Sequence, residues 1–183
     1  MDNFDYAFNY TVGQEGGFTK DPNDAGNWTG GSIGSGQLKG TKFGISAASY
    51  PNVDIENLTI DQAKAIYQKD YWTKYNYDKI TSQLISSKCF DMTVNMGGTA
   101  PYLIQLALKA YTQNNITIDG QIGNETITAL NASNEMNLFF GLEVASGVYY
   151  WTLVNKANSR LKIYFNGWIK RAYNKIITTI KGQ

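Results

Sequence analysis

The chain has 183 residues, of which 43% are hydrophobic and 14% aromatic, and its formal net charge is +1. This length fits one large domain, or a domain with a closely packed second lobe, and the near-neutral charge carries no nucleic-acid signature. The chain has no histidine and one cysteine, Cys89. This composition excludes His-based metal sites, Ser-His-Asp triads, Cys-His dyads and an intrachain disulfide, so we expect acid–base chemistry from Asp and Glu, with no metal and no cofactor.

The first predicted element is a helix over residues 3–15. Four side chains on one of its faces recur at spacings of four, four and three residues: Phe4, Phe8, Val12 and Glu15. The glycine pair at positions 16 and 17 is predicted to end this helix, because glycine adopts the left-handed conformation of helix ends without strain.

Glu15 is the first candidate for chemistry. At the end of a helix and on its apolar face, both the helix dipole and desolvation would raise the pKa of its carboxyl group. A carboxylic acid that keeps its proton near neutral pH can act as a general acid. The structural alternative is a solvated glutamate that precedes a glycine stop.

Residues 18–40 are predicted to form a long loop, because they are rich in Gly, Asn, Ser and Asp and lack apolar periodicity. Loops of this length are usually functional or disordered. Asp21 and Asp24 lie in a D-P-N-D turn of this loop, where carboxylates stay ionised. A protonated acid paired with an ionised carboxylate cleaves glycosidic bonds, although turn formation alone also explains both aspartates.

The remaining elements are mostly helical. A β-hairpin is expected near residues 28–46, and Thr59 with Gln62 fits a capping box that opens a helix through about residue 71. Further helices are expected over residues 80–96, 102–112, 124–130, 134–154 and 159–180. Asn124 should cap the helix over residues 124–130. The helix over residues 102–112 should bury the face that carries Leu103, Leu106, Ala107 and Ala110.

The C-terminal part is basic. No acidic residue follows Glu143, whereas residues 156–183 hold seven Lys and Arg residues. This pattern indicates either a solvated helix face or attraction to an anionic polymer or envelope surface. The N-terminus lacks the pattern of a signal peptide and no stretch approaches a membrane span, so we expect synthesis as a soluble cytosolic protein without stable membrane insertion.

Several motifs in this order resemble the glycoside hydrolase family 108 of N-acetylmuramidases, the phage endolysin type. The N-terminal ones are Glu15-Gly16-Gly17-Phe18, Asp21-Pro22-Asn23-Asp24 and Gly40-Thr41-Lys42-Phe43-Gly44-Ile45-Ser46. The C-terminal ones resemble the predicted peptidoglycan-binding region that usually follows: Phe90-Asp91, Val94-Asn95-Met96-Gly97, Asp119-Gly120-Gln121-Ile122-Gly123, Tyr149-Tyr150 and Gly167-Trp168.

The resemblance implies a mainly α, lysozyme-like fold with a small β-hairpin, a catalytic region over residues 1–88, and a helical lobe over residues 89–183 packed on it. It also implies hydrolysis of the β-1,4 bond between N-acetylmuramic acid and N-acetylglucosamine, with peptidoglycan strands as partner. We expect a monomer made in a bacterial host that reaches the wall after release.

The resemblance also assigns residues. It makes Glu15 the catalytic acid, and a more distant similarity to phage-type lysozymes adds Asp24 and Thr41, with Asn95 lining the cleft. Asp21 and the loop residue Trp28 are candidates for substrate binding. The segment from Asn27 to Gly40 is longer than in many members of the family, which leaves open the roles of Asp21 and Asp24, and makes Thr29 a rival of Thr41.

Three functions remain open at this point. The first is a muramidase, the second a lytic transglycosylase, which needs only the acid, and the third a non-catalytic wall-binding or secretion-associated protein.

Overall fold

The computed structural model describes residues 3–13, 17–112, 115–156 and 160–173. The chain forms two compact units, Met1–Trp72 and Thr73–Gln183. The predicted boundary between residues 88 and 89 therefore falls inside the second unit, within the helix α3 (Gln83–Met96).

The first unit is built on two helices, α1 (Asn3–Thr11) and α2 (Ile60–Tyr67), the second of which continues as a π-helix over Gln68–Trp72. Phe8 packs edge-on against Tyr67, with ring centroids 5.5 Å apart, and Phe4 contacts Trp72 at 5.6 Å. The predicted capping box of α2 is confirmed, because the side chains of Thr59 and Gln62 each accept the other's backbone N–H.

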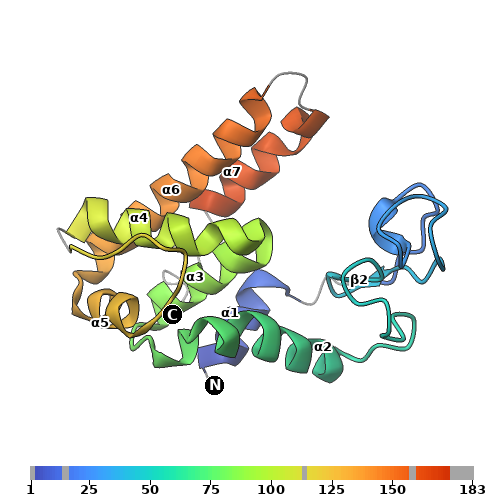
Figure 1. Ribbon diagram of the computed structural model, residues 1–183, viewed down its shortest axis with the longest axis horizontal. Coiled ribbons are helices and arrows are strands. Elements are labelled where there is room, and N and C mark those ends of the chain that lie inside the picture. Colours follow the sequence, from blue (N-terminus) through green and yellow to red (C-terminus); the bar gives the residue numbers. More distant parts are fainter. Residues whose placement is uncertain (1–2, 14–16, 113–114, 157–159, 174–183) are drawn as a thin grey trace. The chain divides into compact units, whose positions relative to one another are not determined.

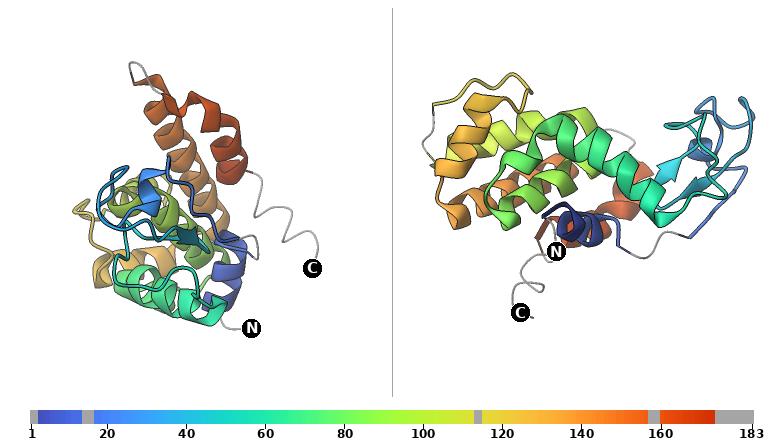
Figure 2. Two further views of the ribbon diagram at one scale, coloured as in Figure 1. Left: turned by 90° about the vertical axis from the view of Figure 1, so that its right-hand side faces the viewer. Right: turned by 90° about the horizontal axis from the view of Figure 1, so that it is seen from below.

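The predicted hairpin of this unit pairs β1 (Thr41–Lys42) with β2 (Ile45–Ser46) in antiparallel register. Phe43 and Gly44 form its two-residue turn, with φ angles of +51° and +75°, as a type I′ turn requires. The phenylalanine in a left-handed conformation costs about 1–2 kcal/mol. Tyr67 of α2 offsets this strain, because its hydroxyl donates to the Phe43 carbonyl at 3.1 Å. Figure 2 shows the loops and short strands gathered at one end of this unit.

The second unit is built from helices and connecting loops, with no strand in its described part. Its long helices are α3, α4 (Ala100–Thr112), α5 (Asn124–Ala132), α6 (Glu135–Asn155) and α7 (Phe165–Tyr173), with a 3₁₀-helix η6 (Arg160–Tyr164) before α7. Helix α6 packs against α3, α4 and α7, and it lies beside α7 in Figure 1. Leu138, Phe139 and Leu142 on its inner side are fully buried, so this helix forms the centre of the unit.

Two polar contacts attach α7 to α3. Arg171 forms an ion pair with the buried Asp91 at 3.0 Å, and the buried Lys88 donates to the Ala172 carbonyl at 3.0 Å. Burial lowers the pKa of Lys88, although the nearby carboxylates oppose this shift. One of the seven basic residues of the C-terminal segment, Arg171, thus forms an ion pair within the fold.

Several details differ from the sequence predictions. Gly123, not Asn124, caps α5, and Asn124 becomes its first residue. In α4 the buried face contains Ile104, Gln105 and Leu108, whereas Leu106 is 51% exposed. Within the predicted helix over residues 159–180, a 3₁₀-helix precedes α7, and residues 157–159 and 174–183 lie outside the described part of the chain.

Candidate active site

The predicted loop over residues 18–40 is ordered by backbone pairing. Thr19 and Thr41 exchange two backbone hydrogen bonds of 2.8 and 2.9 Å, which adds a third short segment beside the hairpin. Farther along, Trp28 pairs with Leu38, and the Thr29 N–H donates to the Gln37 carbonyl. The segment Asn27–Gly40 is therefore a narrow paired loop whose two ends meet next to β1.

Asn27 is the centre of this loop, and its side chain is fully buried. Its amide Nδ2 donates to the Asp21 carbonyl at 3.0 Å, and its Oδ1 accepts from the Thr41 hydroxyl at 2.7 Å. The backbone carbonyl of Asn27 also accepts from Lys39 and Gly40. One residue thus joins the D-P-N-D turn, the base of the paired loop and the first strand.

Asp21 and Asp24 are both exposed and both shape the turn. The Asp24 carboxylate accepts from the Gly26 N–H at 2.9 Å and caps a short 3₁₀-helix, Ala25–Asn27. The Asp21 carboxylate accepts from the backbone and side chain of Asn23. The turn-forming role is therefore confirmed for both residues, and it keeps both carboxylates at the surface, where a substrate can reach them.

Thr41 differs from its rival Thr29 in how its hydroxyl is used. The Thr41 hydroxyl donates its proton to Asn27, so only its lone pairs remain for a further partner. The Thr29 hydroxyl accepts from the Gln37 N–H at 2.9 Å inside the paired loop. Trp28 anchors the loop, because its indole N–H donates to the Pro22 carbonyl at 2.9 Å, and its ring is half-exposed.

Glu15 lies outside the described residues, but the helix before it is described and differs from the prediction. Helix α1 ends at Thr11, and Gly13 has a φ of +65°. The helix is therefore ended by Gly13 and not by the later glycine pair, because the first glycine at the end of the apolar run already provides the left-handed turn. The argument that Glu15 lies on the last turn of this helix is thereby lost.

Asn95 lies on α3 in the second unit, where it is exposed. Its Nδ2 donates to the Asp91 carbonyl at 2.7 Å and approaches the Asp91 carboxylate at 3.2 Å. Its role in lining a cleft stays a prediction.

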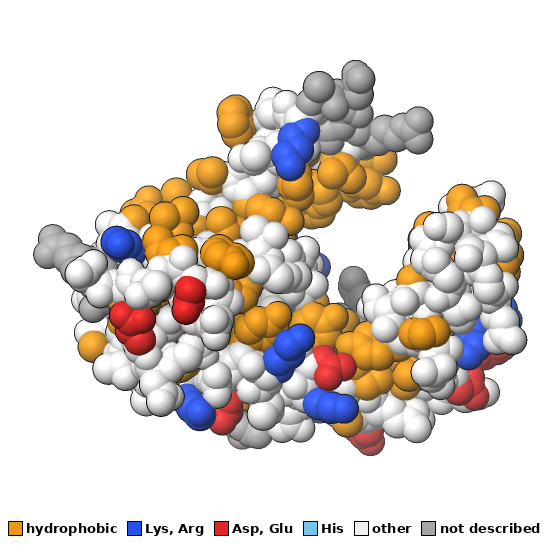
Figure 3. Space-filling view, in the orientation of Figure 1, with side chains coloured by type: hydrophobic (Ala, Val, Ile, Leu, Met, Phe, Trp, Pro, Cys, Tyr) orange, Lys and Arg blue, Asp and Glu red, His pale blue; other side chains and the backbone are white. Residues whose placement is uncertain are grey.

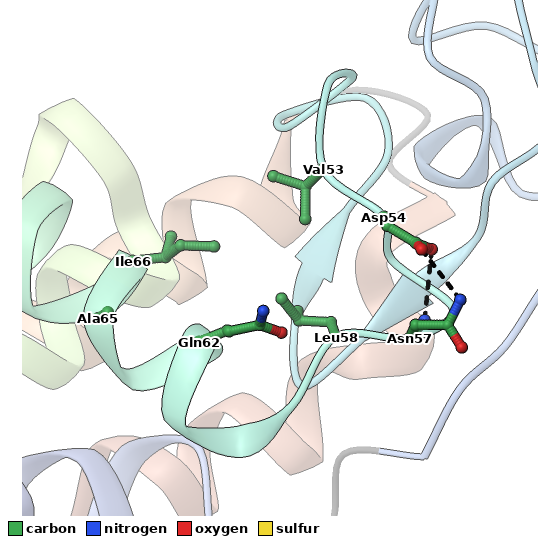
Figure 4. A pocket seen from close by; sticks show the side chains of 7 residues that line it. All are labelled: Val53, Asp54, Asn57, Leu58, Gln62, Ala65 and Ile66. Atoms are coloured by element: carbon green, nitrogen blue, oxygen red, sulfur yellow. Dashed lines mark hydrogen bonds between the residues drawn. The ribbon is translucent and has the colours of Figure 1, made fainter.

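A shallow pocket of about 360 Å³ lies beside the hairpin in the first unit. Figure 4 shows its lining: Val53, Asp54, Asn57, Leu58, Gln62, Ala65 and Ile66. Two hydrogen bonds from Asn57 hold the Asp54 carboxylate and lower its pKa. None of these residues is among the predicted site residues, because they come from a turn and a helix whose sequence signal, the capping box, indicates only where the helix begins.

Sequence reasoning also missed Asn27 and Tyr50. The Tyr50 hydroxyl donates to the Asp70 carboxylate at 3.0 Å, and burial raises its pKa. Both residues are polar and isolated in the sequence, so only the tertiary structure shows their partners. Among the residues that the structure describes, no cluster of His, Cys, Asp and Glu could hold a metal ion.

Two consecutive parts of the chain match known protein families. Residues 8–97 match the family described as glycosyl hydrolase 108. The chain therefore contains a glycosyl hydrolase 108 domain. Residues 100–173 of this glycosyl hydrolase match a predicted peptidoglycan domain, so the protein is a glycoside hydrolase of a peptidoglycan-acting family with a peptidoglycan-binding domain. The division between the two matches follows the end of α3.

The fold of this glycosyl hydrolase is shared with a solved structure from Brucella abortus, SagA. The two chains are 20% identical and superpose with a TM-score of 0.70. The aligned region covers 97% of this chain and 94% of the other. The mainly α, lysozyme-like fold with a small hairpin is therefore confirmed. No curated protein matches the chain. Within the described ranges, no helix has both the length and the apolarity needed to cross a membrane.

Proposed function

We propose that the protein is an N-acetylmuramidase that cleaves the β-1,4 bond between N-acetylmuramic acid and N-acetylglucosamine, with Glu15 as general acid. Membership of glycosyl hydrolase family 108 is the observation that carries this proposal. In such a reaction, Glu15 protonates the bridging oxygen while a water molecule attacks the sugar.

The described loop supports roles for Asp24 and Thr41 in holding that water. Asp24 uses one carboxylate oxygen for the Gly26 N–H, and an ionised carboxylate can accept further hydrogen bonds. Thr41 has already donated its proton to Asn27, so a water molecule beside it must donate and keeps a lone pair for attack. If Asp24 positions water, the product is inverted, whereas attack by a carboxylate itself gives retention. Asp21, Trp28 and Asn95 remain candidates for sugar binding.

The decisive experiment is mass analysis of the muropeptides that wild type and Glu15→Gln release from purified peptidoglycan. We expect the wild type to release fragments with reducing N-acetylmuramic acid ends and Glu15→Gln to release almost none, because the amide cannot donate the required proton. Glu125→Gln is the matched control, since this exposed glutamate lies in the first turn of α5 in the second unit. Equal release by wild type and Glu15→Gln would overturn the assignment.

A second set of variants identifies the loop residue that acts with Glu15. In Asp24→Asn the side chain keeps an oxygen that can cap Gly26 but loses its charge, so a loss of turnover with normal folding assigns the catalytic charge to Asp24. The same comparison with Asp21→Asn, Thr41→Ala and Thr29→Ala separates the remaining candidates. Normal turnover of Asp24→Asn would remove Asp24 from the mechanism.

The same assays test the other functions. Anhydro ends in place of reducing ends would indicate a lytic transglycosylase, and binding without cleavage by the wild type would indicate a wall-binding or secretion-associated protein. EDTA is expected to leave cleavage unchanged.

The proposal extends to the surroundings of the reaction. The protein is made in the cytoplasm of a bacterial host, reaches the wall after release and acts as a monomer. Its basic C-terminal segment attracts it to the anionic envelope, which is testable by the salt dependence of envelope binding.

A further inference from the structure

The outward side of α6 in the second unit is apolar along most of its length. Five large side chains recur every three or four residues, with exposed fractions between 38% and 58%: Met136, Phe140, Val144, Val148 and Trp151. Such spacing places them in one stripe, about 22 Å long, on one face of the helix. Figure 3 shows hydrophobic side chains gathered over α4, α6 and α7.

This stripe is also without charge. Between Glu135 and Lys156 the only charged residue is Glu143, which is buried. A helix packed on a core normally turns charged and polar residues to solvent, and large exposed apolar patches mark interaction sites. The outward face of α6 is therefore built to contact something other than water.

Side chains of the neighbouring helices α4 and α7 border the stripe without covering it. A Cβ on Gly141 would lie 2.8 Å from the Tyr111 ring of α4, and one on Gly147 would lie 2.0 Å from the Tyr173 hydroxyl of α7. By helix geometry these two glycines lie on opposite sides of the stripe. Tyr111 and Tyr173 thus pack closely on α6 as borders and leave the stripe between them accessible.

One end of the stripe is both aromatic and cationic. Beyond Trp151, the 3₁₀-helix η6 exposes Leu161, Ile163 and Tyr164, with Ile163 at 78%. Lys156 and Lys162 are exposed beside them, and no acidic residue follows Glu143 in the chain. We call these six residues the tip: Trp151, Lys156, Leu161, Lys162, Ile163 and Tyr164.

We propose that the tip binds the surface of an anionic lipid bilayer. Trp and Tyr side chains prefer the level of the lipid headgroups, where the apolar ring is buried and the polar edge stays wet. Lysine stems lie along apolar surface while their ammonium groups reach anionic headgroups. Charge complementarity favours this partner over a second copy of the chain, because the tip lysines find no counter-charge in a like tip.

This inference deepens the proposed affinity for the anionic envelope by naming a lipid bilayer as its partner, and it is independent of wall cleavage. It describes peripheral, reversible contact through side chains of α6 and η6. The enzyme would thereby be held at a bilayer that faces the wall, which raises its concentration next to the substrate.

The test is co-sedimentation of the full chain with vesicles of phosphatidylcholine that contain 30% phosphatidylglycerol or none. We expect binding to the anionic vesicles that weakens with salt, and at least tenfold weaker binding of Ile163→Ser with Tyr164→Ser. Replacing Lys156 and Lys162 by Gln should weaken binding about fivefold for each lysine.

Matched controls distinguish binding through the tip from nonspecific binding through exposed apolar or charged side chains elsewhere. Ile33→Ser removes a side chain that is 63% exposed in the first unit, and Lys69→Gln with Lys109→Gln removes two exposed lysines elsewhere. Both should bind within twofold of wild type. Circular dichroism melting confirms that each variant is folded.

Absence of binding to anionic vesicles, equal binding to neutral vesicles, or equal losses in tip and control variants would each overturn the proposal. The stripe would instead be a dimer interface if no vesicles are bound, the protein forms a concentration-dependent dimer in sedimentation equilibrium, and the double variant Phe140→Ser with Val148→Ser is monomeric. That result would also overturn the proposal. Cleavage of lipid-free purified peptidoglycan is measured in parallel, and tip variants should cleave as wild type does. Cleavage without vesicle binding refutes only this proposal, and vesicle binding without cleavage refutes only the muramidase proposal.

Discussion

Replacement of Asn27 by alanine is expected to loosen the loop that carries Asp21, Asp24 and Thr41. The change removes two side-chain hydrogen bonds, of 2.7 Å to Thr41 and 3.0 Å to the Asp21 carbonyl, from a fully buried position. Each such bond contributes about 1 kcal/mol net to stability, and a buried polar partner that is left without a bond to protein or water costs more. We therefore expect the free energy that stabilises this loop to fall by about 2–3 kcal/mol. The backbone bonds from Lys39 and Gly40 to this residue are kept.

Hydrogen exchange of the full chain measures this loss where it occurs. The amides of Thr19 and Thr41 donate across the pairing beside β1, and a local loss of about 2–3 kcal/mol makes their exchange faster by roughly 30- to 150-fold. Urea unfolding reports whether the rest of the chain is affected. Wall cleavage should fall with the loop, because the residues proposed to hold water lose their common support.

Asn23→Ala is the matched control for this experiment. The Asn23 side chain is exposed, and among the described residues it bonds only the Asp21 carboxylate, so its removal should change stability by less than about 0.5 kcal/mol. Exchange rates of Asn27→Ala within threefold of wild type, or an equal effect of Asn23→Ala, would refute the assignment of Asn27 as the centre of the loop.

Three further predictions concern the two units separately. Gln105→Leu should lower the free energy of unfolding by about 3 kcal/mol or more, because the buried amide makes five hydrogen bonds to the 119–126 segment; urea unfolding measures this, and the exposed Gln121→Leu is its control. Burial raises the pKa of Tyr67 to about 12 from 10.0, so its contribution to stability is complete below pH 10 and is lost as the pH rises through 12. Tyr67→Phe should therefore be less stable than wild type by about 1 kcal/mol at pH 8, through loss of the bond to Phe43. Between pH 9 and 12 the free energy of unfolding of wild type should fall by about 2–3 kcal/mol relative to Tyr67→Phe, so the variant becomes the more stable protein at pH 12 in unfolding titrations; an unchanged difference would contradict this. Burial also raises the pKa of Cys89 to about 12, so Ellman's reagent at pH 8 should react with this thiol only after unfolding, and rapid reaction of the folded protein would contradict its burial.

Local signals in the sequence predicted those elements that short-range chemistry decides. The capping box at Thr59 and Gln62 satisfies backbone donors within one turn, so it forms wherever these residues precede a helix. The hairpin expected near residues 28–46 is present as β1 and β2, although its turn at Phe43 and Gly44 was not predicted. The helix predicted over residues 134–154 is confirmed as α6, and its cap Asn134 accepts from the Asn137 N–H.

Errors arose where a partner distant in sequence decides the outcome. The apolar face of α4 was predicted from periodicity, but Gln105 takes an inward position that polarity argues against, because its amide is fully satisfied by the Asp119–Gly120 turn. Leu106 is then turned outward. The motif Asp119–Gly123, which resembles part of a peptidoglycan-binding region, thus contains a turn that is held by hydrogen bonds to the Gln105 side chain.

The sequence by itself determined the class of protein and its inventory of chemistry. The absence of histidine restricts acid–base chemistry to Asp and Glu. The order of the motifs around Glu15, Asp24 and Thr41 resembles glycoside hydrolase family 108, and that resemblance implies a hydrolase of the wall. Only the tertiary structure decided that Asn27 supports the loop, that Tyr67 holds the strained hairpin turn, and that α6 turns an uncharged apolar stripe to solvent. These features depend on contacts between segments far apart in the chain, and local propensity carries no information on such contacts.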